Sequence, residues 1–110
     1  MRTIKKILNE NNIPYELEKT YSDCIFPDTK AHARYDFYIN NTFLLEFDGM
    51  QHFTERNFFR DTLESRQAKD KYKNEYALEH NIPLYRIPYT EEKNLSLELL
   101  TDDRFLVRSA

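Results

Sequence analysis

The sequence predicts an α/β fold in which a mixed β-sheet is flanked by helices, with the element order α-β-β-β-α-β-α. Two adjacent hydrophobic segments alternate with a period of two, as neighbouring strands do. A long helical pattern then separates them from a further strand-like segment, which is typical of a crossover to another strand of the same sheet. Residues 1–110 are expected to form one domain.

A helix, a strand and a loop are expected before the two adjacent strands. Residues 3–11 predict a short helix, because their apolar side chains recur at helical spacing: Ile4, Ile7 and Leu8. Pro14 follows it, and residues 15–21 predict a strand. Residues 22–33 contain turn formers and no periodicity, so a loop is expected there.

The alternation within residues 34–39 and 43–48 predicts how the two strands pair. Their apolar faces coincide in a hairpin only if paired residue numbers sum to an even number, which places Asp36 opposite Glu46. A two-residue turn would give an odd sum. We therefore expect three or another odd number of loop residues, or a bulge. This register brings Asp36, Glu46 and Asp48 onto one face of the sheet.

The second half of the chain predicts a long helix. Asp61 and Glu64 resemble a capping box, and Asn81 and Pro83 end the pattern near residue 80. Periodicity alone does not decide which of two stripes faces the sheet. One stripe contains Leu63, Gln67, Asp70, Asn74 and Ala77, and the other contains Ala68, Tyr72 and Tyr76.

A strand over residues 84–89 and a last helix over residues 91–100 are expected to complete the fold. Thr90 is the predicted N-cap of that helix.

The composition indicates a chain without disulfides or membrane spans. Cys24 is the single cysteine, and no segment is apolar enough for a signal peptide or a spanning helix, so a cytoplasmic location is expected. The net charge of −3 argues mildly against nucleic-acid binding. If three acids held a metal ion, the remaining net charge would be zero.

Three acids on one sheet face predict a metal site. Carboxylates within about 7 Å of one another repel by roughly 2–3 kcal/mol per pair at an effective dielectric near 20. Residues 43–53 contain no Lys or Arg to offset this repulsion, and Arg34 is the nearest candidate. All-oxygen ligation suits Mg²⁺ or Mn²⁺. We therefore expect Asp36, Glu46 and Asp48 to hold such an ion, against the alternative of a solvated acidic face.

The segment YDFYINNTFLLEFDGMQHF resembles the PD-(D/E)xK nuclease superfamily. It is most similar to the branch of very-short-patch-repair endonucleases and related homing endonucleases of phages and mobile elements. The similarity covers about residues 20–90, including a helix with Asp70 and Lys73 before an Arg-bearing strand. The matching motif is Asp-x9-Glu-x-Asp-Gly-x-x-His, formed by Asp36, Glu46, Asp48, Gly49 and His52.

This resemblance implies a restriction-endonuclease-like core and a Mg²⁺- or Mn²⁺-dependent endodeoxyribonuclease that nicks or cuts duplex or branched DNA. Asp36 and Asp48 would hold the metal, with Glu46 as a ligand or as the group that orients the attacking water. Because the ordinary imidazole changes charge near neutral pH, His52 would act as general base or general acid, whereas the alternative is a histidine in a surface turn.

Asp48 occupies the position where the wider superfamily has its catalytic Lys. Lys73 or Lys69 from the helix could substitute, or His52 could transfer the proton. Gln51 and Asp70 are expected to support the metal ligands. For Asp70, a helix cap or a salt bridge to Arg86 is an equal alternative.

DNA is the expected partner. Phosphate contacts are predicted for Arg34 and for a basic stripe of Arg66, Lys69 and Lys73, although a solvated helix face explains the stripe equally well. Tyr72 and Tyr76 suggest packing or a homodimer contact rather than platforms for base stacking. Two rival hypotheses are an inactive relative that binds DNA or a protein, and a structural subunit stabilised by a divalent ion.

Overall fold

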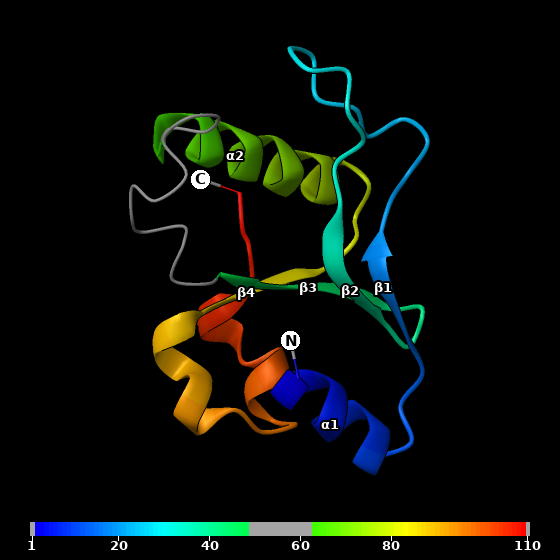
Figure 1. Ribbon diagram of the computed structural model, residues 1–110, viewed down its shortest axis with the longest axis vertical. Coiled ribbons are helices and arrows are strands. Elements are labelled where there is room, and N and C mark those ends of the chain that lie inside the picture. Colours follow the sequence, from blue (N-terminus) through cyan, green and yellow to red (C-terminus); the bar gives the residue numbers. More distant parts are fainter. Residues whose placement is uncertain (1, 49–62, 110) are drawn as a thin grey trace.

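A four-stranded mixed sheet forms the middle of three layers, as the computed structural model of residues 2–48 and 63–109 shows (Figure 1). Helix α2 covers one face of the sheet, and helix α1 with a series of short 3₁₀ turns covers the other. The strand order is β1-β2-β3-β4, with β1, β2 and β3 antiparallel and β4 parallel to β3. The elements are α1 (Arg2–Glu10), β1 (Tyr15–Lys19), β2 (Tyr35–Ile39), β3 (Phe43–Asp48), α2 (Leu63–Glu79) and β4 (Leu84–Pro88).

The hairpin between β2 and β3 has the predicted register. Phe37 pairs with Leu45 and Ile39 with Phe43, so that paired residue numbers sum to 82. Three residues, 40–42, connect the strands, as the parity argument requires. Asn40 and Asn41 have positive φ angles of 53° and 52°, which asparagine tolerates better than most residues. The predicted position of Asp36 opposite Glu46 is therefore confirmed.

The face of the sheet toward α1 is apolar throughout. Its buried cluster joins α1, strands β2, β3 and β4 and the C-terminal turns: Ile4, Leu8, Phe37, Ile39, Leu45, Ile87 and Leu100. These side chains come from alternate positions of β2, β3 and β4, which is the pattern of one strand face. Burying them supplies most of the hydrophobic stabilisation on this side of the sheet.

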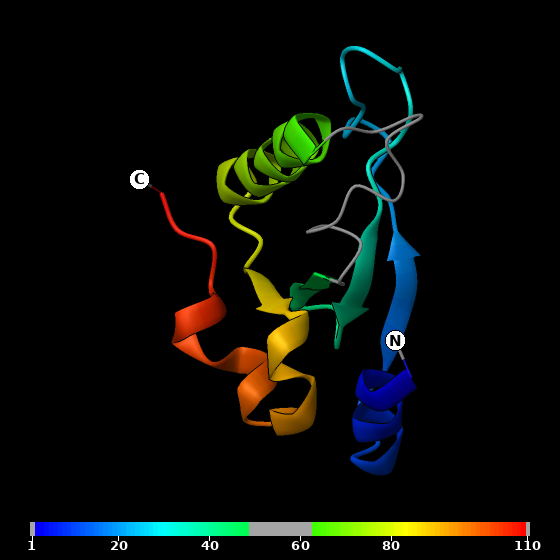
Figure 2. The same cartoon turned by 60° about the vertical axis from the view of Figure 1, so that its left-hand side comes forward.

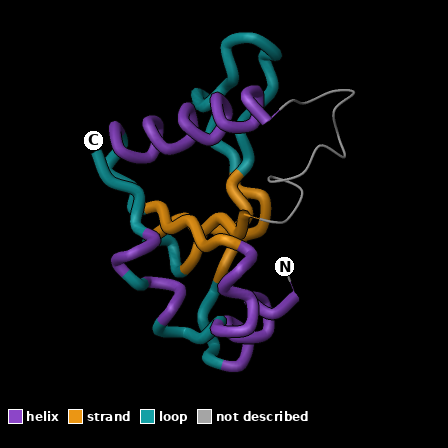
Figure 3. The backbone as a smooth tube through the Cα atoms, turned by 90° about the vertical axis from the view of Figure 1, so that its left-hand side faces the viewer, coloured by secondary structure: helices purple, strands orange, loops and turns teal. Residues whose placement is uncertain are grey.

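The face of the sheet toward α2 is more polar. The loop over residues 20–34 passes beside α2 and completes this layer (Figure 3). The buried cluster between the sheet, the loop and α2 contains Cys24, Ala33, Tyr35, Leu44, Tyr76, Ala77 and Leu84. Tyr76 and Ala77 come from the two different stripes of the helix, so both stripes contribute to the contact with the sheet and the loop.

Tyr35 departs from the predicted alternation. Parity places it with Phe37, yet it is fully buried in the cluster on the α2 side. The β1–β2 ladder is interrupted one residue further along, where Glu18 has a positive φ of 50° and does not pair with Asp36. We attribute the change of side to this irregularity, which alters the twist at the start of β2.

The predicted helix over residues 91–100 is wrong. The segment forms separate 3₁₀ turns at Tyr89–Asn94, Leu99–Thr101 and Asp103–Phe105, and Thr90 caps none of them. Leu95 is extended, and the Ser96 hydroxyl accepts a hydrogen bond from the Leu99 backbone N–H at 3.2 Å. Ser96 thus begins a new turn in the middle of the segment, because its side chain competes for backbone donors.

Local contacts also determine where α2 ends and where the C-terminal segment lies. Helix α2 ends before Asn81, whose φ of 57° terminates it as predicted. The C-terminal segment runs beside β4, where the Val107 N–H donates to the Leu84 carbonyl at 2.8 Å (Figure 2). Within the part of the chain that the structure describes, no helix combines the length and apolar character needed to cross a bilayer.

Candidate functional site

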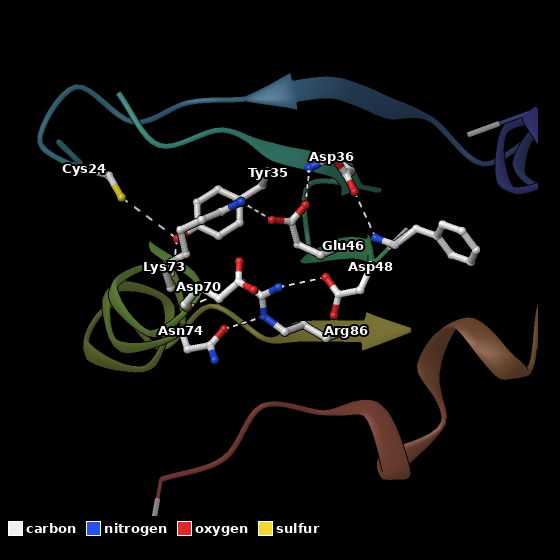
Figure 4. Close-up of polar contacts among 10 residues, drawn as sticks. Cys24, Tyr35, Asp36, Glu46, Asp48, Asp70, Lys73, Asn74 and Arg86 are labelled. Atoms are coloured by element: carbon white, nitrogen blue, oxygen red, sulfur yellow. Dashed lines mark hydrogen bonds and ion pairs between the residues drawn. The ribbon is translucent and has the colours of Figure 1, made fainter. Parts of the chain in front are cut away.

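Asp36 and Glu46 face the α2 layer side by side on neighbouring strands. The Asp36 backbone N–H donates to Glu46 Oε2, and the Phe47 N–H donates to Asp36 Oδ2, both at 2.9 Å. Each carboxylate is therefore held by the backbone of the opposite strand. Because both donors are backbone N–H groups, they hold the two carboxylates in fixed positions (Figure 4).

Lys73 reaches this pair from α2. Its ammonium contacts Glu46 Oε1, and both residues are buried, with 9% and 5% of their surfaces exposed. The ammonium also lies 5.0 Å from the centre of the Tyr35 ring, and the Tyr35 hydroxyl donates to the Lys73 carbonyl at 2.8 Å. Tyr35 thus fixes both the backbone and the side chain of the lysine.

The shared environment moves the two carboxyl pKa values in opposite directions. Burial alone would raise the pKa of Glu46, but the positive charge of Lys73 and its hydrogen bond hold that pKa below the ordinary value. Desolvation of its carboxyl and the neighbouring charge of Glu46 raise the pKa of Asp36 to about 7. Because Asp36 is exposed to solvent, screening reduces the energetic weight of this shift.

A second ionic group lies directly beside the first. Arg86 on β4 donates to Asp48 Oδ1 at 3.1 Å and to Asn74 Oδ1 at 2.6 Å, and its guanidinium lies 3.5 Å from Asp70 Oδ1. The arginine side chain is only 12% exposed, whereas that of Asp48 is 20% exposed. Arg86 therefore connects β3 to two residues of α2 through its planar fork of donors.

The compensating charges of the acids come from distant parts of the chain, and not from Arg34. Arg34 pairs with Glu18 at 3.6 Å on the surface, with both side chains exposed. Lys73 neutralises Glu46, and Arg86 neutralises Asp48. The expectation that the acids lack a basic partner was therefore wrong.

The carboxylates offer oxygen ligands for a hard cation. Among residues 2–48 and 63–109, no group of three or more His, Cys, Asp or Glu side chains is arranged to hold a metal ion. Mg²⁺ commonly uses only one or two carboxylates and keeps its waters. Asp36 and Glu46 fit this mode, because a cation between them would stabilise the charged form of Asp36, whose pKa is raised by desolvation and by the charge of Glu46. Asp48 as a further ligand stays a prediction.

The remaining predicted residues have varied positions. His52 and Gln51 lie outside the described residues, as does the cap residue Asp61. Asp70 makes the salt bridge to Arg86 that was one of its three predicted roles. Lys69 lies with its ammonium 5.8 Å from the Phe26 ring centre, and Arg66 is partly exposed on the same helix.

The predicted basic stripe is not a uniform surface, because Lys73 is buried. The tyrosines of α2 also point inward. Tyr76 is 8% exposed and donates to Asp23 Oδ1 at 2.6 Å, while the Tyr72 ring packs against Phe26. Both therefore pack within the chain, which was the first of their predicted roles, and Tyr72 keeps part of its surface exposed.

Sequence reasoning missed three residues of the site: Tyr35, Asn74 and Arg86 in its role as partner of Asp48. The parallel register of β3 and β4 pairs Glu46 with Arg86, which brings the arginine to the acidic face. A sequence signal did exist, since a lone arginine in an otherwise apolar strand requires a buried acceptor. Its partner could not be chosen without the strand register.

Comparison with known proteins adds no relative. No family model matches the chain, and neither a curated protein nor a solved structure matches it. The function is therefore inferred from the geometry of the site and from the sequence motif.

Proposed function

We propose that the protein is a metal-dependent DNA endonuclease with a restriction-endonuclease-like core. The observation that supports this most strongly is the contact between Lys73 and Glu46, beside Asp36. The motif alone has Asp48 in the place of the superfamily's lysine. Here a lysine from α2 provides the missing ammonium, so an Asp, a Glu and a Lys meet at one point on the sheet.

Asp36 and Glu46 would hold the metal ion. When bound, Mg²⁺ or Mn²⁺ supplies Lewis acidity and lowers the pKa of a coordinated water. The hairpin register places these oxygens, and the backbone donors of Asp36 and Phe47 keep them in place. Sites built on strands in this way hold ligands more rigidly than sites on loops.

Lys73 would act on the developing charge of the phosphoryl group. Its ammonium is buried and held between Glu46 and the Tyr35 ring, so little reorganisation is needed when a phosphate approaches. Arg86 would act through Asp48, whose carboxylate it orients toward the same face. His52 is proposed as the proton-transfer group, on the basis of the motif alone.

A cleavage assay with plasmid and branched DNA tests the proposal. Wild-type protein is expected to nick or cut in Mg²⁺ or Mn²⁺ and to stop in EDTA. Asp36→Asn and Glu46→Gln should each reduce the rate by about 10²–10⁴-fold, the range for removing a group that stabilises the transition state. Unchanged cleavage in both variants would place the active site elsewhere.

Lys73→Met has a matched control on the same helix. Lys71 is also a lysine of α2, but its side chain is 79% exposed and pairs only loosely with Glu75 at 3.9 Å. Lys73→Met should abolish cleavage, whereas Lys71→Met should leave it unchanged. Equal rates in the two variants would remove Lys73 from the mechanism.

An inactive DNA-binding relative is the second candidate function. The observation in its favour is that Lys73 and Arg86 already neutralise Glu46 and Asp48, so these two acids do not require a cation. Retention of DNA in a gel shift with Ca²⁺, together with no cleavage in Mg²⁺ or Mn²⁺, would support this alternative. Cleavage in either metal would exclude it.

A further inference from the structure

A cavity of about 290 Å³ lies between the loop before β2 and the first half of α2. Phe26 and Pro27 line it from the loop, and Ala68, Lys69 and Tyr72 line it from the helix. Figure 3 shows this loop and helix side by side, away from the layer that contains α1. The volume is at the lower end of small-molecule sites and suits one planar ring system.

The lining combines aromatic rings with a cation. The rings of Phe26 and Tyr72 lie with their centres 5.5 Å apart and their planes tilted by 54°, and the Lys69 ammonium is 5.8 Å from the Phe26 centre. Both rings are partly exposed. Because the planes are tilted, the two rings are not stacked face to face, and the partly exposed Tyr72 offers a surface that suits a flat ligand.

The cavity is next to the proposed cleavage site. Lys69 and Lys73 are one helical turn apart on α2, so their Cα atoms are about 6 Å apart along the axis. Lys73 contacts Glu46, whereas Lys69 lies at the cavity. A polymer with one phosphate near Lys73 would therefore place its adjoining unit near Lys69 and the cavity.

The lining also argues against a simple polyanion as the occupant. Asp28 and Ser65 lie at the cavity with Lys69, so its charged groups are of both signs. A negatively charged chain without rings would gain from the lysine but be repelled by the aspartate. A nucleotide can use both, because the exocyclic amino group of its base donates to carboxylate and hydroxyl oxygens while its phosphate accepts from an ammonium.

We propose that this cavity binds one unstacked nucleobase of a single-stranded or flipped nucleotide adjacent to the scissile phosphate. The proposal rests on the proposed nuclease function and gives it a substrate class, namely DNA with an unpaired base next to the cut. Stacking on Tyr72 would provide sequence-tolerant affinity, and Lys69 would contact the neighbouring phosphate.

The base dependence is tested first on the unmodified protein. Single-stranded oligonucleotides that carry 2-aminopurine or an abasic site are titrated in Ca²⁺ with anisotropy and fluorescence readouts. The protein should quench 2-aminopurine by stacking and bind the abasic strand about tenfold more weakly, since stacking of one base accounts for such a factor. Equal affinity for the intact and abasic strands would overturn the proposal.

Two substitutions at one position then separate stacking from packing. Tyr72→Phe keeps an aromatic face and should bind within about twofold of wild type. Tyr72→Leu keeps apolar volume without the ring, so it should lose quenching and about tenfold in affinity. Thermal unfolding of both variants checks that they fold. Unchanged binding in a folded Tyr72→Leu variant would overturn the proposal.

The outcomes distinguish this inference from the nuclease proposal. Quenching that depends on Tyr72, without cleavage in any metal, would support the base site and remove the nuclease function. Cleavage with no preference for unpaired bases would keep the nuclease and remove the base site.

Discussion

The two faces of the central sheet use the same strands for different purposes. Toward α1, alternate residues of β2, β3 and β4 form an apolar cluster with Ile4 and Leu8. Toward α2, the intervening residues include Glu46, Asp48 and Arg86, which are joined to Lys73 and Asp70. One strand therefore contributes to hydrophobic stability on one side and to an ionic network on the other.

The difference shows how the protein can hold unfavourable groups. Buried ion pairs are weak evidence for stability, because desolvation offsets most of their attraction. An apolar face that is already well packed allows the opposite face to carry them. The following predictions test this division, from the largest expected effect to the smallest.

Phe37→Ala should destabilise the protein by about 3–5 kcal/mol, because Phe37 is 1% exposed in the apolar cluster. Urea unfolding followed by circular dichroism measures the change. At urea concentrations too low to unfold the variant, its DNA affinity should remain near that of wild type, since Phe37 faces α1 and not the candidate site. A loss below about 1 kcal/mol would show that this face does not carry the stability.

Lys73→Met should cost about 3 kcal/mol, because it leaves Glu46 buried without its cation. The double variant Lys73→Met with Glu46→Gln should recover most of this loss, since both charges are then absent. Urea unfolding of the two variants provides the comparison. Equal stability of the single and double variants would contradict the buried pair.

Arg86→Lys should destabilise by about 1–2 kcal/mol, because lysine cannot contact Asp48, Asn74 and Asp70 together. The matched control is Arg104→Lys, whose side chain is 64% exposed and pairs with Asp102. That control should change stability by less than about 0.5 kcal/mol. Similar effects of the two substitutions would argue against a special role of the three-partner contact.

The smallest effect concerns pH. In EDTA, the folded-state pKa of Asp36, about 7, is above its ordinary value of 3.8, so the native state binds more protons between these values. Stability should therefore fall as pH rises from about 4 to 7. Asp36→Asn should remove this slope and stabilise the metal-free protein at pH 8 by about 0.2–1 kcal/mol after screening.

Glu46 gives the pH profile its other limit. Because its pKa is lowered in the folded state, it contributes stability that is lost as pH falls below its ordinary value of 4.5. Glu46→Gln should reduce that acid loss and also shrink the upper slope, because the charge of Glu46 contributes to the raised pKa of Asp36, whereas Asp36→Asn should remove only the upper slope. Thermal melts from pH 3 to 8 distinguish the two carboxyls, and an unchanged profile in both variants would contradict their assignment.

Local pattern was sufficient to predict the hairpin and the adjacency of Asp36 and Glu46. The sum of paired residue numbers in the hairpin is either even or odd, and only an even sum places the apolar side chains of both strands on one face. The bounds of β3 and the end of α2 at Asn81 followed from the same kind of local information.

The partners of the acids could not be predicted in the same way. Lys73 is 27 residues from Glu46, and Arg86 is 38 residues from Asp48. The contact of Lys73 depends on the rotation of α2, which two competing helical stripes left undecided. The contact of Arg86 also depends on the β3–β4 register, which the sequence does not specify. The Ser96 side chain and the irregularity at Glu18 similarly overrode the periodicity of their own segments.

Lys73 also fixes the angular setting of α2. Its carbonyl accepts from the Tyr35 hydroxyl and its ammonium contacts Glu46, so one residue is held at both ends by two strands. A helix turns by about 100° per residue, since 3.6 residues make one turn. Inserting a single alanine between Tyr72 and Lys73 would leave these contacts in register but rotate every earlier residue of α2, including Lys69 and Tyr72, by that angle. An insertion after Lys73 would instead misplace Tyr76 and Ala77, so the position of the insertion decides which half of this layer is lost.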